Sequence, residues 1–439
     1  MTGSECPIPN AHRRLEEAHR LWHRAAESYD DPDEFRTNLN ALLQALRSVT
    51  FVLQKEKAGI PDFDAWYERW REIMAKDAVL AWSLEARNHI VHAGDLETFS
   101  TATAGIQASW DEPETVTFEV PPLMPTLAIA GSLAEREIPE EVRKGGLLRV
   151  ERRWVAADLR DWELLEALAH AYELLAHLIR DAHRQAGAPL DTVEVEERHE
   201  GEFSTDAGGL PPCMVATEEL RTVIVNLRTN EILERKVVPI VSTSDSREEA
   251  RKRYRFNVDE LPRPTSSDPL DLVPFYMEIA KGILKRDKWH AEFAFLLHPE
   301  GLATLTARPA DQQEKYLFMN DVANEVRRLG ATGVVLIADT WWLENPDDLP
   351  KGKRPGEVKE RREGLMVMGL RSDGERRVRF TSYRRRLGRI QFDDAVEVGA
   401  DQSFFLAPVL RAWGLSVPSE QEALERMYGD GLEREGPTP

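Results

Sequence analysis

The spacing of apolar residues changes twice in the first part of this chain. From about residue 10 to residue 92, apolar side chains recur every three to four positions, which is the spacing of helices with one buried face. Residues 113–158 instead hold short β-like runs, including 127–130, that are separated by prolines, and helical spacing returns over 161–186. The sequence therefore predicts a helical domain interrupted by an extended or β-containing insertion.

Local signals mark where several of these helices begin and end. Asp31 is followed by Pro32 and Glu34, which supply a capping side chain, a proline at the first helical position and an acid in the first turn. Asp77 is expected to break or re-cap the helical region before a further helix, and Gly94 is expected to end that helix.

The remaining sequence predicts a second, mixed region. Residues 188–268 are expected to form a linker and β-hairpin region: 188–212 are acidic and then rich in glycine and proline, and a hairpin, 222–227 with 232–241, follows. Residues 269–420 alternate between helical and strand patterns, and 421–439 are expected to form a tail. The predicted fold class is multidomain α+β, with a helical domain over 1–187. The elements expected in the last domain are helices 270–285 and 311–329, and strands 291–298, 301–307, 332–339, 364–371 and 376–383.

Composition restricts the class of protein. Only Cys6 and Cys213 occur among 439 residues, so we expect neither a disulfide framework nor a cysteine-based zinc site, as suits a reducing cytoplasm. No signal-peptide core and no apolar run long enough to cross a membrane are present. Nucleotide-binding and hydrolase motifs are also missing. We therefore expect a cytoplasmic protein without a membrane partner, metal or cofactor.

The net charge of −20 hides one basic segment. Residues 351–389 hold 14 lysines or arginines and five acids, a local balance of +9, which favours a localised site for a polyanion. The alternative is a set of solvated strands paired with surrounding acids. The predicted nucleic-acid-binding residues are Arg376, Arg377, Arg379, Tyr383, Arg384, Arg385, Arg386 and Arg389, in which the tyrosine would stack on a base.

A motif in the helix before Gly94 carries the main functional hypothesis. Leu80, Leu84 and Val91 form its expected buried stripe, so Arg87 and Asn88 fall where a buried residue is expected. Asn88 and His92 are four positions apart and share a face, which Arg87 can reach with its long side chain. This Arg-polar-x3-His arrangement resembles that of the HEPN superfamily, over roughly the first 190 residues.

The resemblance implies a four-helix bundle and metal-independent RNA cleavage by attack of a 2'-hydroxyl, giving 2',3'-cyclic phosphate ends. His92 would transfer a proton, Arg87 would hold the phosphate and Asn88 would orient one of them, with Glu85 and Asp95 in support. The resemblance also implies a homodimer through the helical domain and a regulated toxin or anti-phage defence effector with an inhibitory or activating partner. The alternative is a non-catalytic HEPN dimerisation module with a C-terminal nucleic-acid-binding domain, in which Arg87 pairs with Glu85 or Asp95 and His92 caps the helix.

Two smaller groups of residues leave alternatives open. His170, Glu173 and His177 have spacings that suit a metal, but both histidines lie opposite the apolar stripe of their helix, which favours a solvated helix face. Asp339, Trp341 and Trp342 follow an apolar strand and either line a pocket or pack at the edge of the core.

Overall fold

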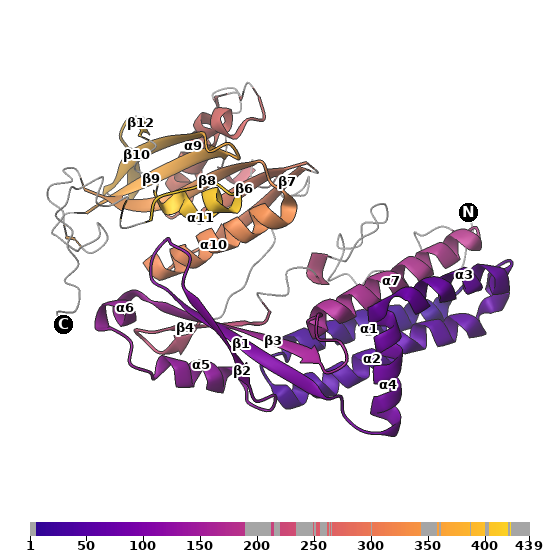
Figure 1. Cartoon of the computed structure of the whole chain (residues 1–439). Helices are drawn as coiled ribbons and strands as arrows, with labels where there is room; N and C mark the ends of the chain where they lie inside the picture. Colours follow the sequence, from indigo (N-terminus) through magenta and orange to yellow (C-terminus); the bar gives the residue numbers. More distant parts are fainter. Residues whose placement is uncertain are drawn as a thin grey trace. The chain divides into compact units, whose positions relative to one another are not determined.

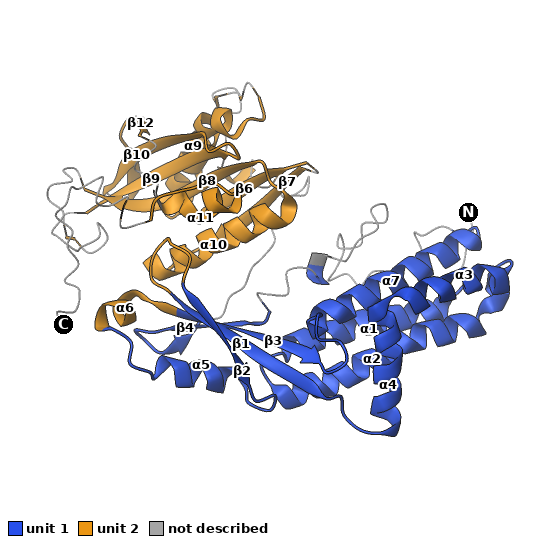
Figure 2. Cartoon of the chain, in the orientation of Figure 1, with its two compact units in different colours: residues 1–106, 114–139, 148–233 blue, residues 107–113, 140–147, 234–439 orange. Residues whose placement is uncertain are grey.

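Two β-sheets, each with its own helices, organise the computed structural model of this chain (Figure 1). The structure describes residues 6–188, 212–214, 220–233, 249, 252–254, 261–419 (except 263, 265, 300, 344–357, 360, 387 and 400–403) and 422. The chain forms two compact units (Figure 2). Unit 1 comprises Met1–Ile106, Glu114–Pro139 and Leu148–Leu233, and unit 2 comprises Gln107–Pro113, Glu140–Leu147 and Glu234–Pro439.

The long helices of unit 1 share one apolar core. Asp31 accepts hydrogen bonds from the amides of Asp33 and Glu34, and Asp77 accepts one from the amide of Leu80, so both predicted helix starts are confirmed. A 3-10 turn, Lys57–Gly59, follows the second helix. The helices are α1 (Pro9–Glu27), α2 (Pro32–Lys55), α3 (Phe63–Lys76), α4 (Ala78–His92) and α7 (Leu164–Gln185).

The chain between α4 and α7 builds most of a sheet in unit 1. The strands are β1 (Thr98–Gln107), β2 (Thr115–Val120), β3 (Leu147–Ala156), β4 (Thr222–Asn226) and β5 (Glu231–Ile232), in the order β2-β1-β3-β4-β5. The described part of the predicted hairpin, β4 with β5, therefore joins the same sheet as the predicted insertion, and its residues 234–241 lie outside the described residues. Two expectations were wrong: β1 begins before residue 113, and 127–130 lie in a helix, α5 (Thr126–Ala134), because Ile129 and Ala130 pack in the core beside this sheet whereas Leu127 is exposed. A short helix, α6 (Glu140–Gly145), follows.

Unit 2 is a sheet covered by helices on both faces. Among the described residues it has seven strands, in the order β11-β10-β9-β8-β6-β7, with β12 also paired to β10. One apolar core lies under α9 (Pro269–Asp287), and a second lies under α10 (Gln312–Leu329) and α11 (Ala407–Ala412). The strands are β6 (Glu292–His298), β7 (Gly301–Ala307), β8 (Gly333–Trp342), β9 (Arg362–Arg371), β10 (Arg376–Arg386), β11 (Arg389–Phe392) and β12 (Val396–Val398).

The predicted mixed α+β class with a helical N-terminal region is confirmed. The helices and strands expected over 269–383 all form, and β8 lies between β6 and β9 in the interior of its sheet. Within the parts that the structure describes, no helix has the length and apolar character needed to cross a membrane. The predicted domain boundaries stay predictions.

A fully buried arginine joins the loops of unit 1. The Arg152 side chain is 0% exposed and donates to the backbone carbonyls of Pro121 (3.3 Å), Pro122 (3.0 Å) and Met124 (2.6 Å). It also donates to the hydroxyl of Ser100 at 3.1 Å. Burial lowers its pKa to about 10, so the guanidinium stays charged at neutral pH. A charged group is tolerated here because its hydrogen bonds replace those with water.

A buried carboxyl group begins α7. Glu163 accepts hydrogen bonds from the Tyr29 hydroxyl (2.9 Å) and from the backbone amide of Glu166 (3.1 Å). Arg221 lies beside Glu163 at 3.6 Å and also pairs with Glu151 and Glu166. Burial raises the pKa of Glu163 to about 7, although the arginine opposes this shift.

This raised pKa predicts a pH-dependent stability. The folded state holds a proton on Glu163 that the unfolded chain releases, so the wild-type protein loses stability as pH rises from about 4.5 through about 7. Glu163→Gln removes this titration. Between pH 4.5 and 8, the unfolding free energy of the variant should therefore rise by about 3 kcal/mol relative to wild type.

Urea denaturation at the two pH values measures the difference, and Glu166→Gln is the control because it removes a half-exposed partner of the same arginine. A Glu163→Gln difference that does not change with pH would contradict the prediction.

Candidate functional site

The helix with the predicted catalytic motif turns a different face to the core than expected. The buried residues of α4 are Val79, Trp82 and Ala86, whereas Leu84 is 38% exposed and Val91 is 45% exposed. The expected stripe was therefore wrong. The prediction took the face through Leu80, Leu84 and Val91 as the buried one. In the structure α4 packs against α2, α3 and α7, and these contacts bury the face that carries Trp82 instead.

The motif residues do not assemble a buried site. Asn88 and His92 are exposed, and the Arg87 guanidinium donates to the side-chain Oδ1 of Asn88 at 3.1 Å. Glu85 is also exposed. Asp95 binds Arg36 and the side-chain amide of Asn40 rather than a motif residue. Asp95 therefore does not contact the motif residues as predicted, and it does not pair with Arg87 as the alternative required.

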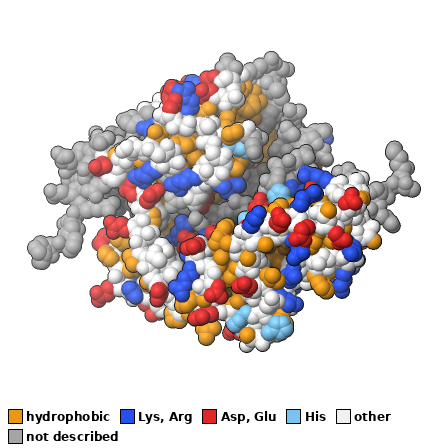
Figure 3. All heavy atoms as spheres, turned by 45° about the vertical axis from the view of Figure 1, so that its right-hand side comes forward, with side chains coloured by type: hydrophobic (Ala, Val, Ile, Leu, Met, Phe, Trp, Pro, Cys, Tyr) orange, Lys and Arg blue, Asp and Glu red, His pale blue; other side chains and the backbone are white. Residues whose placement is uncertain are grey.

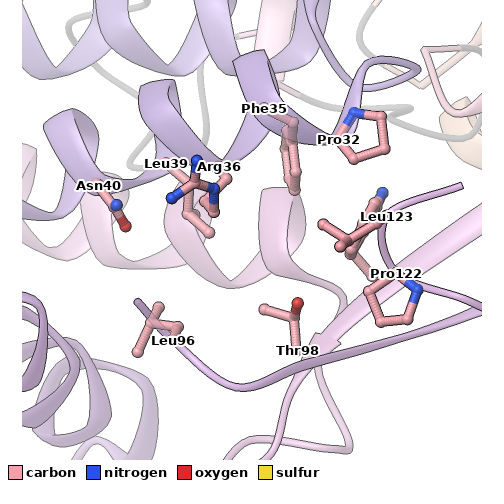
Figure 4. A pocket seen from close by; sticks show the side chains of 10 residues that line it. Pro32, Phe35, Arg36, Leu39, Asn40, Leu96, Thr98, Pro122 and Leu123 are labelled. Carbon is pink, nitrogen blue, oxygen red and sulfur yellow. The ribbon is translucent and has the colours of Figure 1, made fainter. Parts of the chain in front are cut away.

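The partners of Asp95 line an apolar hollow in unit 1. Arg36 and Asn40 stand at one side of it, and Leu123 lies at the other with 74% of its surface exposed (Figure 4). Trp154 completes the lining. Arg36 and Asn40 both bind Asp95, so the mostly apolar hollow offers few polar groups that could orient a ligand. The lining residues are Pro32, Phe35, Arg36, Leu39, Asn40, Leu96, Thr98, Pro122, Leu123 and Trp154.

The structure distributes the predicted basic residues of β10 and β11 over the two faces of the sheet. On the α9 face, Arg377 and Arg379 pair with Glu397, and Arg385 pairs with Glu363. Arg376 lies on the opposite face, partly buried, in register with Leu370 of the second core. Most of the loop before β9, which contributes to the basic segment, lies outside the described residues.

Tyr383 is buried on the α9 face, so its predicted role in base stacking was wrong. It is 2% exposed and donates from its hydroxyl to both carboxylate oxygens of Asp339, at 2.9 and 3.0 Å. Burial raises the pKa of Asp339 to about 6. Asp339 was predicted either to line a pocket or to pack at the edge of the core. The structure shows the second arrangement.

Three arginines remain together on the other face. In the antiparallel β10–β11 ladder, Arg384 lies opposite Gln391 and Arg386 lies opposite Arg389. The side chains of Arg384, Arg386 and Arg389 therefore leave the same face of the sheet. All three are exposed, and within the described part of the chain no acid pairs with them. In Figure 3, acidic and basic side chains are interspersed over the face of the molecule that is shown.

Aromatic rings lie on the same face of the sheet. The strand registers place Phe380 of β10 and Trp342 of β8 on the face of Arg384. Their rings meet edge to face, with centroids 5.3 Å apart. Gly364 lies beneath them, and a β-carbon there would stand 3.3 Å from the Trp342 ring and in the space of the Phe380 ring. We call Trp342, Phe380, Arg384, Arg386 and Arg389 the arginine–aromatic face.

Histidines and both cysteines gather in unit 1. Cys6 lies with His12 and His183, and Cys213 lies with His19 and His23. Burial lowers the pKa of His12 to about 4 and raises that of the Cys6 thiol. Neither group could be predicted from spacing along the chain, because each cysteine lies far in sequence from at least one of its histidines.

The other histidines considered for a metal have different partners. His170 lies 2.8 Å from the Asp77 carboxylate, and His177 lies 3.9 Å from that of Glu173. His170 and Asp77 therefore join α7 to the start of α4, and the spacing that suggested a metal has a structural explanation.

The fold and these surfaces define a two-unit α+β protein in which the predicted catalytic motif forms no enclosed site. The family model of bacteriophage lambda protein ea47 matches residues 2–426, so the chain belongs to this family. Protein ea47 of Escherichia phage lambda is 27% identical over 340 residues, which make up 75% of this chain and 78% of that protein. No solved structure matches the chain.

These comparisons correct the resemblance stated from sequence. The match extends over nearly the whole chain and identifies a family other than HEPN. The predictions of a HEPN-type endoribonuclease and of a HEPN dimerisation module were therefore wrong. An arginine and a histidine at this spacing on an exposed helix are too weak a signal, and no catalytic role is retained for Arg87, Asn88 or His92.

Proposed function

We propose that the chain binds single-stranded nucleic acid through the arginine–aromatic face of unit 2. The observation that supports this most is the group Arg384, Arg386 and Arg389, which are exposed, share one face and have no acidic partner among the described residues. Guanidinium groups bind phosphate oxygens through paired N–H donors. Three of them beside one another can follow a phosphate backbone.

The aromatic rings favour a single strand over a duplex. Bases that are unpaired can stack on side-chain rings, and each such contact contributes about 1–3 kcal/mol without requiring a particular base. Trp342 and Phe380 are partly exposed on the face that carries the arginines. A duplex hides the faces of its bases, so it could use the arginines but not the rings.

The sheet gives this face a fixed geometry. β10 pairs with β9 from Arg376 to Tyr383 and with β11 from Tyr383 to Arg386, so the arginine side chains leave a hydrogen-bonded surface. Buried Tyr383 and Ile390 anchor the opposite side under α9. A surface held in this way loses little conformational entropy when it binds.

We expect the double variant Arg384→Ala/Arg386→Ala to bind single-stranded RNA and DNA at least about tenfold more weakly than wild type, because two charged phosphate contacts are lost. The dependence of log affinity on log salt should also decrease by about 1.4, or about 0.7 for each phosphate contact. Fluorescence anisotropy of labelled oligonucleotides over a series of salt concentrations measures both quantities.

The matched control is Arg327→Ala/Arg328→Ala, which makes the same charge change on α10, where Arg328 pairs with Glu325 and Arg327 with Glu112. Equal losses in the two variants would mean that net charge, not this face, governs binding. Equal affinity of wild type for duplex and single strand would remove the role of the rings. No binding to either strand type at low salt would end the proposal.

Two partner predictions are untested and stay predictions. A homodimer through the helical unit would have the exposed Leu84 and Val91 of α4 as one apolar surface. Sedimentation of wild type and Leu84→Glu/Val91→Glu would test it. An inhibitory or activating partner also stays a prediction.

A further inference from the structure

We propose that Cys6, His12 and His183 form a binding site for a zinc-type divalent metal ion, and that His19, His23 and Cys213 form a second site of the same composition. Each group offers one sulfur and two imidazole nitrogens within 4.8 Å of one another. The groups lie in unit 1, apart from the arginine–aromatic face of unit 2, so this inference does not depend on the proposed function.

Helix α1 contributes a histidine face to both sites. His12, His19 and His23 are about two turns and one turn apart, so they lie along one side of the helix. His183 comes from the last turn of α7, and Cys6 precedes α1. Cys213 lies in a 3-10 turn, Pro212–Met214, whose Met214 is buried in the helical core.

The first group has the spacing of a tetrahedral metal site. Zinc–sulfur bonds of about 2.3 Å and zinc–nitrogen bonds of about 2.0–2.1 Å place sulfur and nitrogen ligands about 3.6 Å apart. The Cys6 sulfur lies 3.7 Å from His12 Nδ1 and 3.6 Å from His183 Nε2. Both sulfur–nitrogen distances therefore already match those of a tetrahedral zinc site.

The second group is slightly tighter. Two nitrogen ligands of a tetrahedral zinc ion lie about 3.3 Å apart. His19 Nε2 lies 3.2 Å from His23 Nε2 and 3.1 Å from the Cys213 sulfur. The Tyr172 ring stacks on His19, with centroids 5.5 Å apart, and Trp22 meets His23 edge to face, so neighbouring rings orient both imidazoles. An ion here would require the sulfur to move outward by about half an ångström.

The composition of the groups adds a second argument. The chain has two cysteines and 11 histidines, and each cysteine lies beside two histidines. Their partners are distant in sequence: Cys6 and His183 are 177 positions apart, and His19 and Cys213 are 194 apart. Cysteine and histidine together suit zinc rather than magnesium or calcium, which prefer oxygen ligands.

Bound ions would join distant parts of unit 1. The first ion would tie the segment before α1 to the end of α7, and the second would tie residues 212–214 to α1. Three protein ligands leave the fourth position of each ion for water or another ligand. The competing account is hydrogen bonding between thiol and imidazole, which needs no ion and would not respond to metal.

The test uses the full chain, stripped of metal with a chelator and titrated with Co²⁺. Cobalt bound by a thiolate gives a charge-transfer absorption in the near ultraviolet, and Zn²⁺ should abolish it by displacement. We expect two equivalents of bound metal per chain. Cys6→Ser and Cys213→Ser should each remove one equivalent and about half of the absorption, and the double variant should remove both.

The control is His170→Gln, which changes a histidine outside both groups and should leave two equivalents bound. His23→Gln, at a partly exposed position, gives a second test of its site if a cysteine variant folds poorly. Zinc should also raise the melting temperature of wild type but not of the double cysteine variant. Loss of one equivalent in only one cysteine variant would retain that site and overturn the other. Absence of thiolate–cobalt absorption in wild type would overturn both.

Discussion

Arg152→Met should lower the free energy of unfolding of unit 1 by about 3–5 kcal/mol, because it leaves three backbone carbonyls and two hydroxyls, those of Ser100 and Thr126, without the donor that binds them. Methionine retains much of the arginine's volume but offers no donor. The carbonyls of Pro121, Pro122 and Met124 lie in the turn before α5, so this turn should loosen first.

Urea denaturation measures the loss, and hydrogen–deuterium exchange resolved by peptide should assign it to unit 1. Arg153→Met is the matched control: it is the next residue of β3, it is exposed, and its side chain donates to one carbonyl only, that of Asp161. We expect this control to change stability by less than about 0.5 kcal/mol. Equal losses in the two variants would show that the buried bonds of Arg152 contribute little net stability.

Gly369→Ala should destabilise unit 2 by about 3 kcal/mol, because α9 crosses β9 with no room for a side chain at this position. A β-carbon on Gly369 would lie 2.7 Å from the carbonyl carbon of Pro269 and 2.9 Å from a methyl group of Val273. The first of these atoms is backbone at the start of α9, so the helix itself would have to move away from the sheet.

Denaturation with peptide-resolved exchange again separates the units, and the loss should appear in α9 and β9. Gly131→Ala is the control, since no atom lies within 4 Å of a β-carbon there and the residue is inside α5. That change should be neutral or stabilising by up to about 1 kcal/mol. A Gly369→Ala protein as stable as wild type would mean that α9 is not held closely against β9.

The sequence was most informative where structure depends on neighbours along the chain. Asp31 and Asp77 start the helices that their side chains cap. Asp311 and Gly330 likewise bound α10, with the glycine at a positive φ of 59°. The strands of unit 2 follow from β-like runs separated by turns. Because these signals act over a few residues, reading them requires no knowledge of the tertiary fold.

The candidate sites were less predictable from sequence. The basic segment of the sequence includes β10 and β11, but alternation along β10 places Tyr383 and Arg385 on one face of the sheet and Arg384 and Arg386 on the other. Which arginines lack an acid depends on the carboxylates that neighbouring strands bring close. The sequence predicted Tyr383 as the aromatic partner of these arginines, whereas the rings on the face of Arg384 and Arg386 belong to Phe380 and Trp342.

The sequence by itself determined the order and the boundaries of most helices and strands, because capping, turn formation and apolar periodicity are local properties of the chain. Only the tertiary structure decided which face of α4 is buried, that Arg152 lies inside unit 1, and that each cysteine meets two histidines. These features depend on side chains that are distant in sequence and become neighbours through packing. No spacing along the chain records such neighbours, so they cannot be read before the fold is known.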